Sequence, residues 1–229
     1  MTTICEVAFS AAHAGDDVAL HRAPPDLAGH WTEVPGLLSL DIYTPVIGGV
    51  HDPYVQDGPA PQQLAMLAFA SLDALDCAVR SAPFGAGLSA TKLAILSCTA
   101  MQRSDHVIAG EAAPTKLVAP FSYVVRYHRP AADEARFIRH YVETHPPLLG
   151  RLPHIRNVMC YVPLPWRDPA GHPSANYLIG NEVTFDHQEA FNAAMASPVR
   201  HELRAHYHAL PPYSGRNTHF PMRRTRLLG

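Results

Sequence analysis

The stretch Phe121-Ser-Tyr-Val-Val-Arg-Tyr-His128 decides how the second half of the chain is read. Its side chains alternate between two faces of a predicted β-strand. One face carries Phe121, Tyr123, Val125 and Tyr127, and the other carries Ser122, Val124, Arg126 and His128. A strand with one apolar and one partly polar face suits a sheet that borders a pocket, and we expect the polar face to line it.

The segments after this strand complete a recognisable order. A polar start at residues 130–133 precedes an amphipathic helix that runs into Tyr141, His145 and Pro146-Pro147. A second strand follows Leu152-Pro153, a third ends at Phe185, and a second helix closes at Ser197-Pro198. Strand, helix, strand, strand, helix, strand is the ferredoxin-like plan.

Three patterns in this half carry a family resemblance. They are Tyr127-His-Arg-Pro130, the spacing Phe137-x-x-x-Tyr141-x-x-x-His145-x-Pro147, and Phe185-Asp186 followed by an Ala-rich helix and Ser197-Pro198. Together they resemble the EthD family of dimeric α/β-barrel proteins. The resemblance implies a pocket on the open face of the sheet, with a histidine at the position of His145 facing it.

The first half repeats the plan more faintly. Val34-Pro35 and the strand up to Pro45 mirror Leu152-Pro153 and the strand up to Pro163, and Phe69 to Pro83 mirrors Phe185 to Pro198. We therefore predict an α+β fold in which two tandem ferredoxin-like (βαββαβ) repeats form a pseudo-dimeric α/β barrel. The repeats would span residues 1–108 and 121–229, joined by a linker at 109–120.

Two differences from an exact duplication stand out. Residues 14–17 suggest a turn, and only residues 26–31 remain where the second half has a full helix, so the first helix of the first repeat is degenerate. Long connections at about 47–62 and 166–175 fall at equivalent points, and long loops often cover sites.

Composition limits the function classes. The chain has 229 residues, of which 47% are hydrophobic and 17% charged, which is typical of a globular protein. No apolar run approaches the roughly 20 residues of a membrane span, and the N-terminus has no signal-like core, so we expect a cytoplasmic protein. The net charge of −2 and a diffuse basic excess in the second half argue against nucleic acid, and the opposite signs of the halves are consistent with a homodimer.

His145 is the strongest candidate for catalysis. It lies on the apolar face of the predicted helix, just before Pro146-Pro147, where burial and the helix end would shift its pKa. The alternative is a histidine that caps the helix or packs in the core. The resemblance favours the catalytic interpretation.

The remaining candidates surround it. His128 and Arg126 share a strand face and could bind a carboxylate, an enolate or a phenolate, although His128 could equally be an exposed strand end. Tyr141 could donate to a carbonyl oxygen or simply pack. Asn181 and Tyr177, which we place on one face of the third strand, are weaker substrate-binding candidates.

We expect no metal and no tightly bound cofactor. His201 and His206 resemble a zinc-protease pair but are five residues apart, about 140° around a helix, so they cannot face one ion. A haem-binding protein remains an alternative, because relatives of this barrel type bind haem.

The patterns together suggest an enzyme that acts on a hydrophobic carbonyl or phenolic compound in a catabolic or secondary-metabolic pathway. His145 would move a proton, and His128 with Arg126 would hold the resulting anion. The chemistry would be that of a cofactor-free oxidoreductase, such as a monooxygenase, or of an isomerase, cyclase or lyase. A non-catalytic ligand-binding or assembly protein is the alternative, and a cavity that His145 and His128 share would favour the enzyme.

Overall fold

The computed structural model describes residues 2–11, 29–55, 60–91 and 93–229. In chain order the elements are β1 (Thr2–Ala11), β2 (Ser39–Pro45), β3 (Gln63–Phe69), α2 (Leu72–Val79), α3 (Ala82–Ala90), β4 (Leu93–His106), β5 (Phe121–His128), α4 (Glu134–Leu149), β6 (Asn157–Pro163), β7 (Tyr177–Phe185), α5 (Gln188–Met195), α6 (Pro198–Ala209) and β8 (Asn217–Leu228). The fold is α+β, as predicted. The degenerate helix predicted for the first half falls within residues 14–31, and most of that segment lies outside the described residues.

The strands close into one antiparallel barrel in the order β1-β3-β2-β8-β5-β7-β6-β4. The first half of the chain supplies β4-β1-β3-β2 and the second half supplies β8-β5-β7-β6. The halves meet where β2 pairs with β8 and β4 pairs with β6. Closure gives every strand two partners, so the sheet has no free edge.

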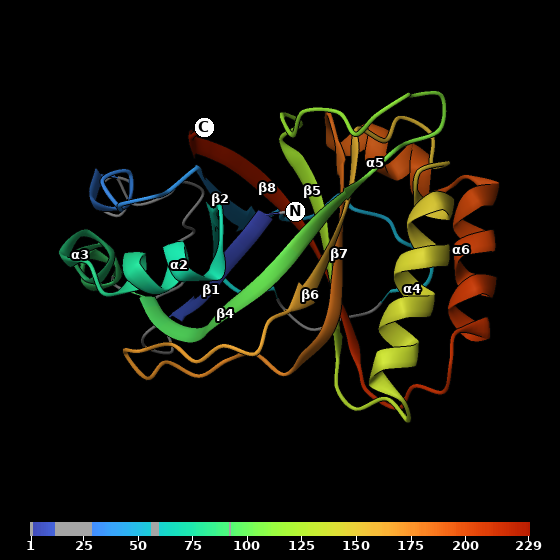
Figure 1. Ribbon diagram of the computed structural model, residues 1–229. Coiled ribbons are helices and arrows are strands. Elements are labelled where there is room, and N and C mark those ends of the chain that lie inside the picture. Colours follow the sequence, from blue (N-terminus) through green and yellow to red (C-terminus); the bar gives the residue numbers. More distant parts are fainter. Residues whose placement is uncertain (1, 12–28, 56–59, 92) are drawn as a thin grey trace.

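The helices cover the outside of the barrel in two groups. Figure 1 shows α4 and α6 side by side on one side of the molecule, with α2 and α3 on the opposite side. Aromatic residues of β5 and β7 pack under α4, α5 and α6 in one hydrophobic cluster, and a second cluster lies under α2 and α3. Each half therefore has its own core between a sheet and its helices.

Helix α4 differs from the prediction at its end. Asp133 caps its start, where the carboxylate accepts a hydrogen bond from the Arg136 amide at 2.9 Å. The helix does not stop at Pro146-Pro147 but continues to Leu149, with Gly150 as its C-cap. His145 thus lies inside the last turns of the helix rather than at its end. A proline near a helix end removes few hydrogen bonds, which is why the two prolines are tolerated there.

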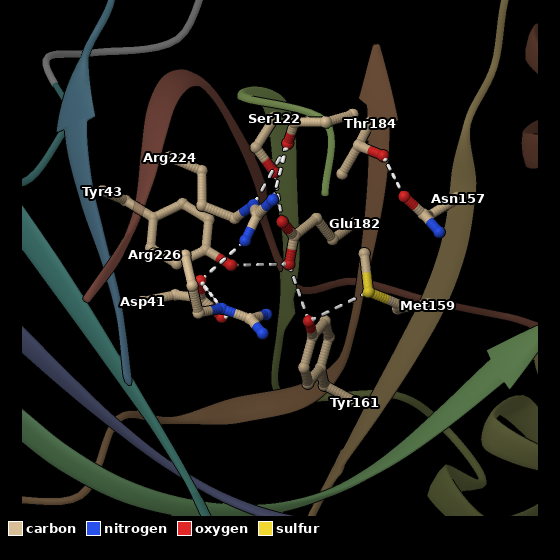
Figure 2. A network of polar contacts seen from close by, with 11 residues as sticks. Asp41, Tyr43, Ser122, Asn157, Met159, Tyr161, Glu182, Thr184, Arg224 and Arg226 are labelled. Atoms are coloured by element: carbon tan, nitrogen blue, oxygen red, sulfur yellow. Dashed lines mark hydrogen bonds and ion pairs between the residues drawn. The ribbon is translucent and has the colours of Figure 1, made fainter. Parts of the chain in front are cut away.

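Side chains fill the middle of the barrel, and many of them are polar. Figure 2 shows the carboxylate of Glu182 accepting hydrogen bonds from Tyr161, at 2.6 Å, and from Ser122. Nearby, Asp41 accepts from Arg224 and Arg226, each at 2.6 Å. Since these residues come from β2, β5, β6, β7 and β8, the network ties the two halves together from inside.

Within the described parts of the chain, no helix is long and apolar enough to cross a membrane.

Candidate active site

A small cavity lies between the outer face of the second half's sheet and the helices α4 and α6. Its volume is about 100 Å³. The floor comes from β5, β7 and β8, the neighbouring helices α4 and α6 form the walls, and residues 54–55 also line it. The polar and aromatic residues that line it are Tyr54, Tyr123, Tyr127, His145, Asn181, Arg200, Arg204, Tyr207, Asn217 and His219.

His145 projects from α4 into this space and is only 5% exposed. Its Nδ1 lies 3.0 Å from Nδ1 of His206 on α6, and Nε2 of His206 lies 3.0 Å from the Thr144 hydroxyl oxygen. The Thr144 hydroxyl donates its single proton to the His140 carbonyl at 2.6 Å, so it must accept from Nε2–H of His206.

This chain of donors fixes the tautomers of both histidines. With the proton of His206 on Nε2, its Nδ1 is an acceptor, and the proton between the rings belongs to Nδ1 of His145. Nε2 of His145 then carries a lone pair. No described residue donates a hydrogen bond to it, so it is a free basic nitrogen in a residue that lines the cavity.

Burial reinforces the neutral state. Burial first, and then the neighbouring His206 and Arg200, lower the pKa of His145 to about 3. The pKa of His206 is also lowered, first by burial and then by His140. Both rings are therefore neutral at physiological pH.

Asn181 supplies a second polar atom. Its amide nitrogen donates to the Tyr141 hydroxyl at 2.5 Å, whereas its Oδ1 is buried and has no hydrogen-bond partner among the described residues. Tyr141 is itself fully buried behind the cavity, its ring 4.6 Å from that of His145. A buried unpaired carbonyl is costly, and a ligand donor would satisfy it.

The connection after β2 closes the cavity, as the position of the long loop predicts. Asp52 accepts from Arg200 at 2.9 Å and from the Tyr123 hydroxyl at 2.7 Å. The loop backbone is held to α5, where Asn192 donates to the Gly49 carbonyl at 2.8 Å. The first half of the chain thus provides the cover for the cavity of the second half.

Arg204 is the second cation of the cavity. Arg200 is bound to Asp52, but the guanidinium of Arg204 makes no ion pair with any described residue. It lies 5.4 Å from the ring centres of both Tyr54 and Tyr207. Cation–π contacts hold the group in place and leave its charge available to an anion.

Comparison with known proteins places this region in a family. The EthD domain family matches residues 129–208, which include α4, β6, β7, α5 and nearly all of α6. Residues 129–208 are therefore similar to an EthD domain. Its cavity residues on α4, β7 and α6 all lie within the match. No curated protein is significantly similar to the chain in sequence.

Solved structures share the whole barrel. An anthrone oxidase-like protein is 11% identical, with a TM-score of 0.57 over 99% of this chain and 93% of that one. A candidate monooxygenase from Fusobacterium nucleatum subsp. nucleatum ATCC 25586 is 8% identical, with a TM-score of 0.56 over 98% and 92% of the two chains. Another, from Lactobacillus acidophilus NCFM, is 11% identical with a TM-score of 0.50 over 98% and 95%. At these identities the likeness concerns the fold.

The structure does not bring His128 and Arg126 to the cavity that His145 lines. Both lie on the β5 face that points into the barrel, and the cavity lies on the aromatic face. Arg126 is 1% exposed and ion-paired with Glu6, its Nε 3.1 Å from the carboxylate. His128 lines a different depression at the mouth of the barrel, with its Nε2 3.2 Å from the Thr218 hydroxyl. The expected pairing of His145 with His128 and Arg126 is therefore wrong.

Tyr177 is also misplaced by the prediction. A register shift between β5 and β7 pairs Tyr127 with Ile179 and His128 with Tyr177, which leaves Leu178 as an extra residue. The extra residue reverses the alternation, so Tyr177 joins the barrel interior while Asn181 lines the cavity. The two side chains do not share a face.

Sequence reasoning missed His206, Arg200, Arg204 and Asp52. Helix α6 runs from Pro198 to Ala209, so His206 lies within it. Its spacing Arg200, Leu203, Arg204, Tyr207 follows the i, i+3, i+4, i+7 pattern of one helix face, which could have indicated a cavity wall.

Among the residues that the structure describes, no three His, Cys, Asp or Glu side chains are grouped as metal ligands would be. The cavity of about 100 Å³ does not by itself hold a haem, because it is well below the 300–1,000 Å³ of pockets that bury drug-sized ligands.

Proposed function

We propose that the protein is a small-molecule enzyme in which Nε2 of His145 removes a proton from a phenolic or enolisable carbonyl compound. The observation that carries the proposal is the hydrogen-bond chain from Thr144 through His206 to His145. It leaves one unprotonated nitrogen in a residue that lines an aromatic cavity. A fixed acceptor in such a place is what general base catalysis requires.

The low basicity of His145 limits the substrate class. A base whose pKa is about 3 accepts a proton only when the product anion stays beside the new imidazolium and compensates its burial. The substrate must therefore be more acidic than an ordinary alcohol or CH2 group, as phenols and doubly activated CH2 compounds are. Arg204 would hold the oxyanion, and Oδ1 of Asn181 would accept from a substrate hydroxyl.

Oxygen chemistry is one continuation of this step. If the substrate is a doubly activated CH2 compound, His145 takes one proton and the carbanion reacts with O2 as the oxidant. The CH2 group becomes C=O, with one oxygen atom from O2, and the other oxygen leaves with the two hydrogens as water. The names of the anthrone oxidase-like and monooxygenase-like neighbours support this route.

We also infer that the barrel consists of two tandem ferredoxin-like repeats. Both halves show the strand order 4-1-3-2 when their strands are numbered separately, and both place two helices between their third and fourth strands. The second half would then carry the proposed base, and the loop after β2 of the first half would border the same cavity.

Oxygen uptake with anthrone as the probe tests the function. The wild type should consume O2 and form the quinone, and His145→Ala should lower kcat/KM by about 10²–10⁴-fold. His128→Ala is the matched control and should stay within twofold, because His128 lies in another depression. Full turnover by His145→Ala, or a loss confined to His128→Ala, would contradict the proposal.

A further inference from the structure

A larger groove adjoins the cavity of His145. Its volume is about 960 Å³, and its lining is mostly apolar, with Val46, Ile47, Val50, Ala196, Phe220 and Pro221 among its residues. The side chain of Ile47 at this groove is 75% exposed. Ile47 and the apolar lining together form a contiguous concave apolar surface, which is typical of ligand-binding grooves.

The groove and the inner cavity share part of their walls. Val55, Tyr123, Met195 and His219 line both. The loop after β2 borders both as well, because Asp52 holds Arg200 and Tyr123 on the cavity side and itself lines the groove. A ligand that enters the inner cavity therefore leaves its outer end in the groove.

The sizes of the two spaces determine how a substrate can lie. The inner cavity of about 100 Å³ admits a small polar group or part of a ring, whereas whole-ligand pockets hold about 300–1,000 Å³. His145, Asn181 and Arg204, whose polar atoms are proposed to meet the substrate, line the inner space. The groove offers mainly aliphatic and proline surface.

We propose that the natural substrate is an elongated amphiphile, with an acidic hydroxyl or carbonyl end at His145 and an apolar chain or ring system in the groove. This inference rests on the proposed function and names the shape of its substrate. Small phenols would bind weakly, because they leave the groove empty. Binding would strengthen with each CH2 group placed against the groove, by up to about four-fold per group.

Calorimetric titration with 4-methylphenol and 4-heptylphenol tests the proposal on the full-length chain. The heptyl compound should bind at least about ten-fold more tightly to the wild type. Ala196→Phe should abolish that gain and leave 4-methylphenol binding unchanged, because Ala196 is exposed and lines only the groove. Ala193→Phe is the matched control, since Ala193 is exposed on α5 but outside the groove, and it should keep the gain.

The outcomes separate this inference from the proposed function. If both phenols bind equally, or if Ala196→Phe and Ala193→Phe keep the same gain, the groove is not the subsite although His145 can still act as the base. If neither phenol binds, both proposals are overturned. If Ala196→Phe instead shifts the monomer–dimer ratio in native mass spectrometry and the phenol series is flat, a second copy of the chain covers the groove and the inference is wrong.

Discussion

The two halves of the barrel present similar sheets to their helices but fill the space between them differently. In the second half, the space beside Leu149 is the cavity of His145. In the first half, Trp31 stands at the matching position, three residues before Val34-Pro35 as Leu149 stands before Leu152-Pro153. The Trp31 ring is fully buried and stacks on Phe84, with centres 5.8 Å apart.

The helices are adapted to this difference. Gly87 of α3 and Leu203 of α6 occupy equivalent positions. Each lies six residues after the serine that precedes its helix, Ser81 for α3 and Ser197 for α6. A Cβ atom at Gly87 would lie 2.2 Å from the Trp31 ring, so glycine is required there. Phe84 likewise stands where α6 has Arg200, which binds the loop over the cavity.

The strands differ in polarity on the same face. Counted from their last residues, Phe69 and Phe185, Ala65 of β3 corresponds to Asn181 of β7. Phe9 of β1 corresponds to Tyr127 of β5, because each strand pairs with its neighbour at the matching register. At equivalent positions between sheet and helices, the first half thus has an apolar core where the second half has a polar-lined cavity. The comparison indicates that the proposed active site lies where side chains do not fill the space between sheet and helices.

The largest expected effect on stability comes from removing the indole ring that fills the core of the first half. Trp31→Ala should lower the free energy of unfolding by about 3–5 kcal/mol, because the ring is buried on all sides. Leu149→Ala should cost only about 2 kcal/mol, since Leu149 already borders a cavity. Urea unfolding of both variants measures the difference, and equal losses would contradict it.

Much of this frame could be predicted from the sequence. The alternation from Phe121 to His128 gave a correct strand, the stripe on α4 placed His145 on the buried side, and the EthD resemblance is confirmed. Which face of the sheet borders the cavity could not be predicted, because alternation does not say which side the helices cover.

Other features depend on long-range contacts. The extra residue Leu178 in β7 has no signature in composition, so Tyr177 was assigned to the wrong face. The pairing of His145 with His206 joins residues 61 positions apart and depends on how α6 lies against α4. The contact of Asp52 with Arg200 joins the two halves of the chain.

Introducing the Trp–Gly pair of the first half into the second half should eliminate ligand binding. In Leu149→Trp/Leu203→Gly the indole would occupy the cavity, as Trp31 does above Gly87. We expect calorimetric titration to show at least a hundred-fold weaker binding of 4-heptylphenol, with Leu203→Gly alone as the control for the helix. Unchanged binding by a folded double variant would show that the ligand lies elsewhere.

Acid sensitivity should also distinguish the halves. Because burial depresses the pKa of His145 in the folded state to about 3, the unfolded chain binds the extra proton between pH 6.5 and 3. Stability linked to this ring is present above pH 6.5 and is lost as the pH falls, by up to about 1.4 kcal/mol per pH unit. His145→Gln should show a shallower loss in urea titrations at several pH values, whereas a slope identical to the wild type would rule the effect out.

The smallest effect should come from Thr144, at the end of the hydrogen-bond chain that runs through His206 to His145. Thr144→Val removes the acceptor for Nε2–H of His206, so His206 can change tautomer and His145 is no longer fixed. We expect kcat/KM for anthrone to fall by less than about ten-fold, equivalent to about 1 kcal/mol for one hydrogen bond, with KM unchanged. Thr144→Ser retains the hydroxyl and should restore the rate. A loss that serine does not rescue would point to packing instead.

The central claim is that His145, and not His128, receives the ligand through an unprotonated Nε2. Nitrogen-15 NMR of histidine-labelled protein at pH 7, before and after addition of 4-heptylphenol, tests it most directly. The account predicts a His145 ring protonated on Nδ1 alone, whose Nε2 signal moves on titration while the His128 signals stay in place. A His145 ring protonated on Nε2, or a shift confined to His128, would contradict the account.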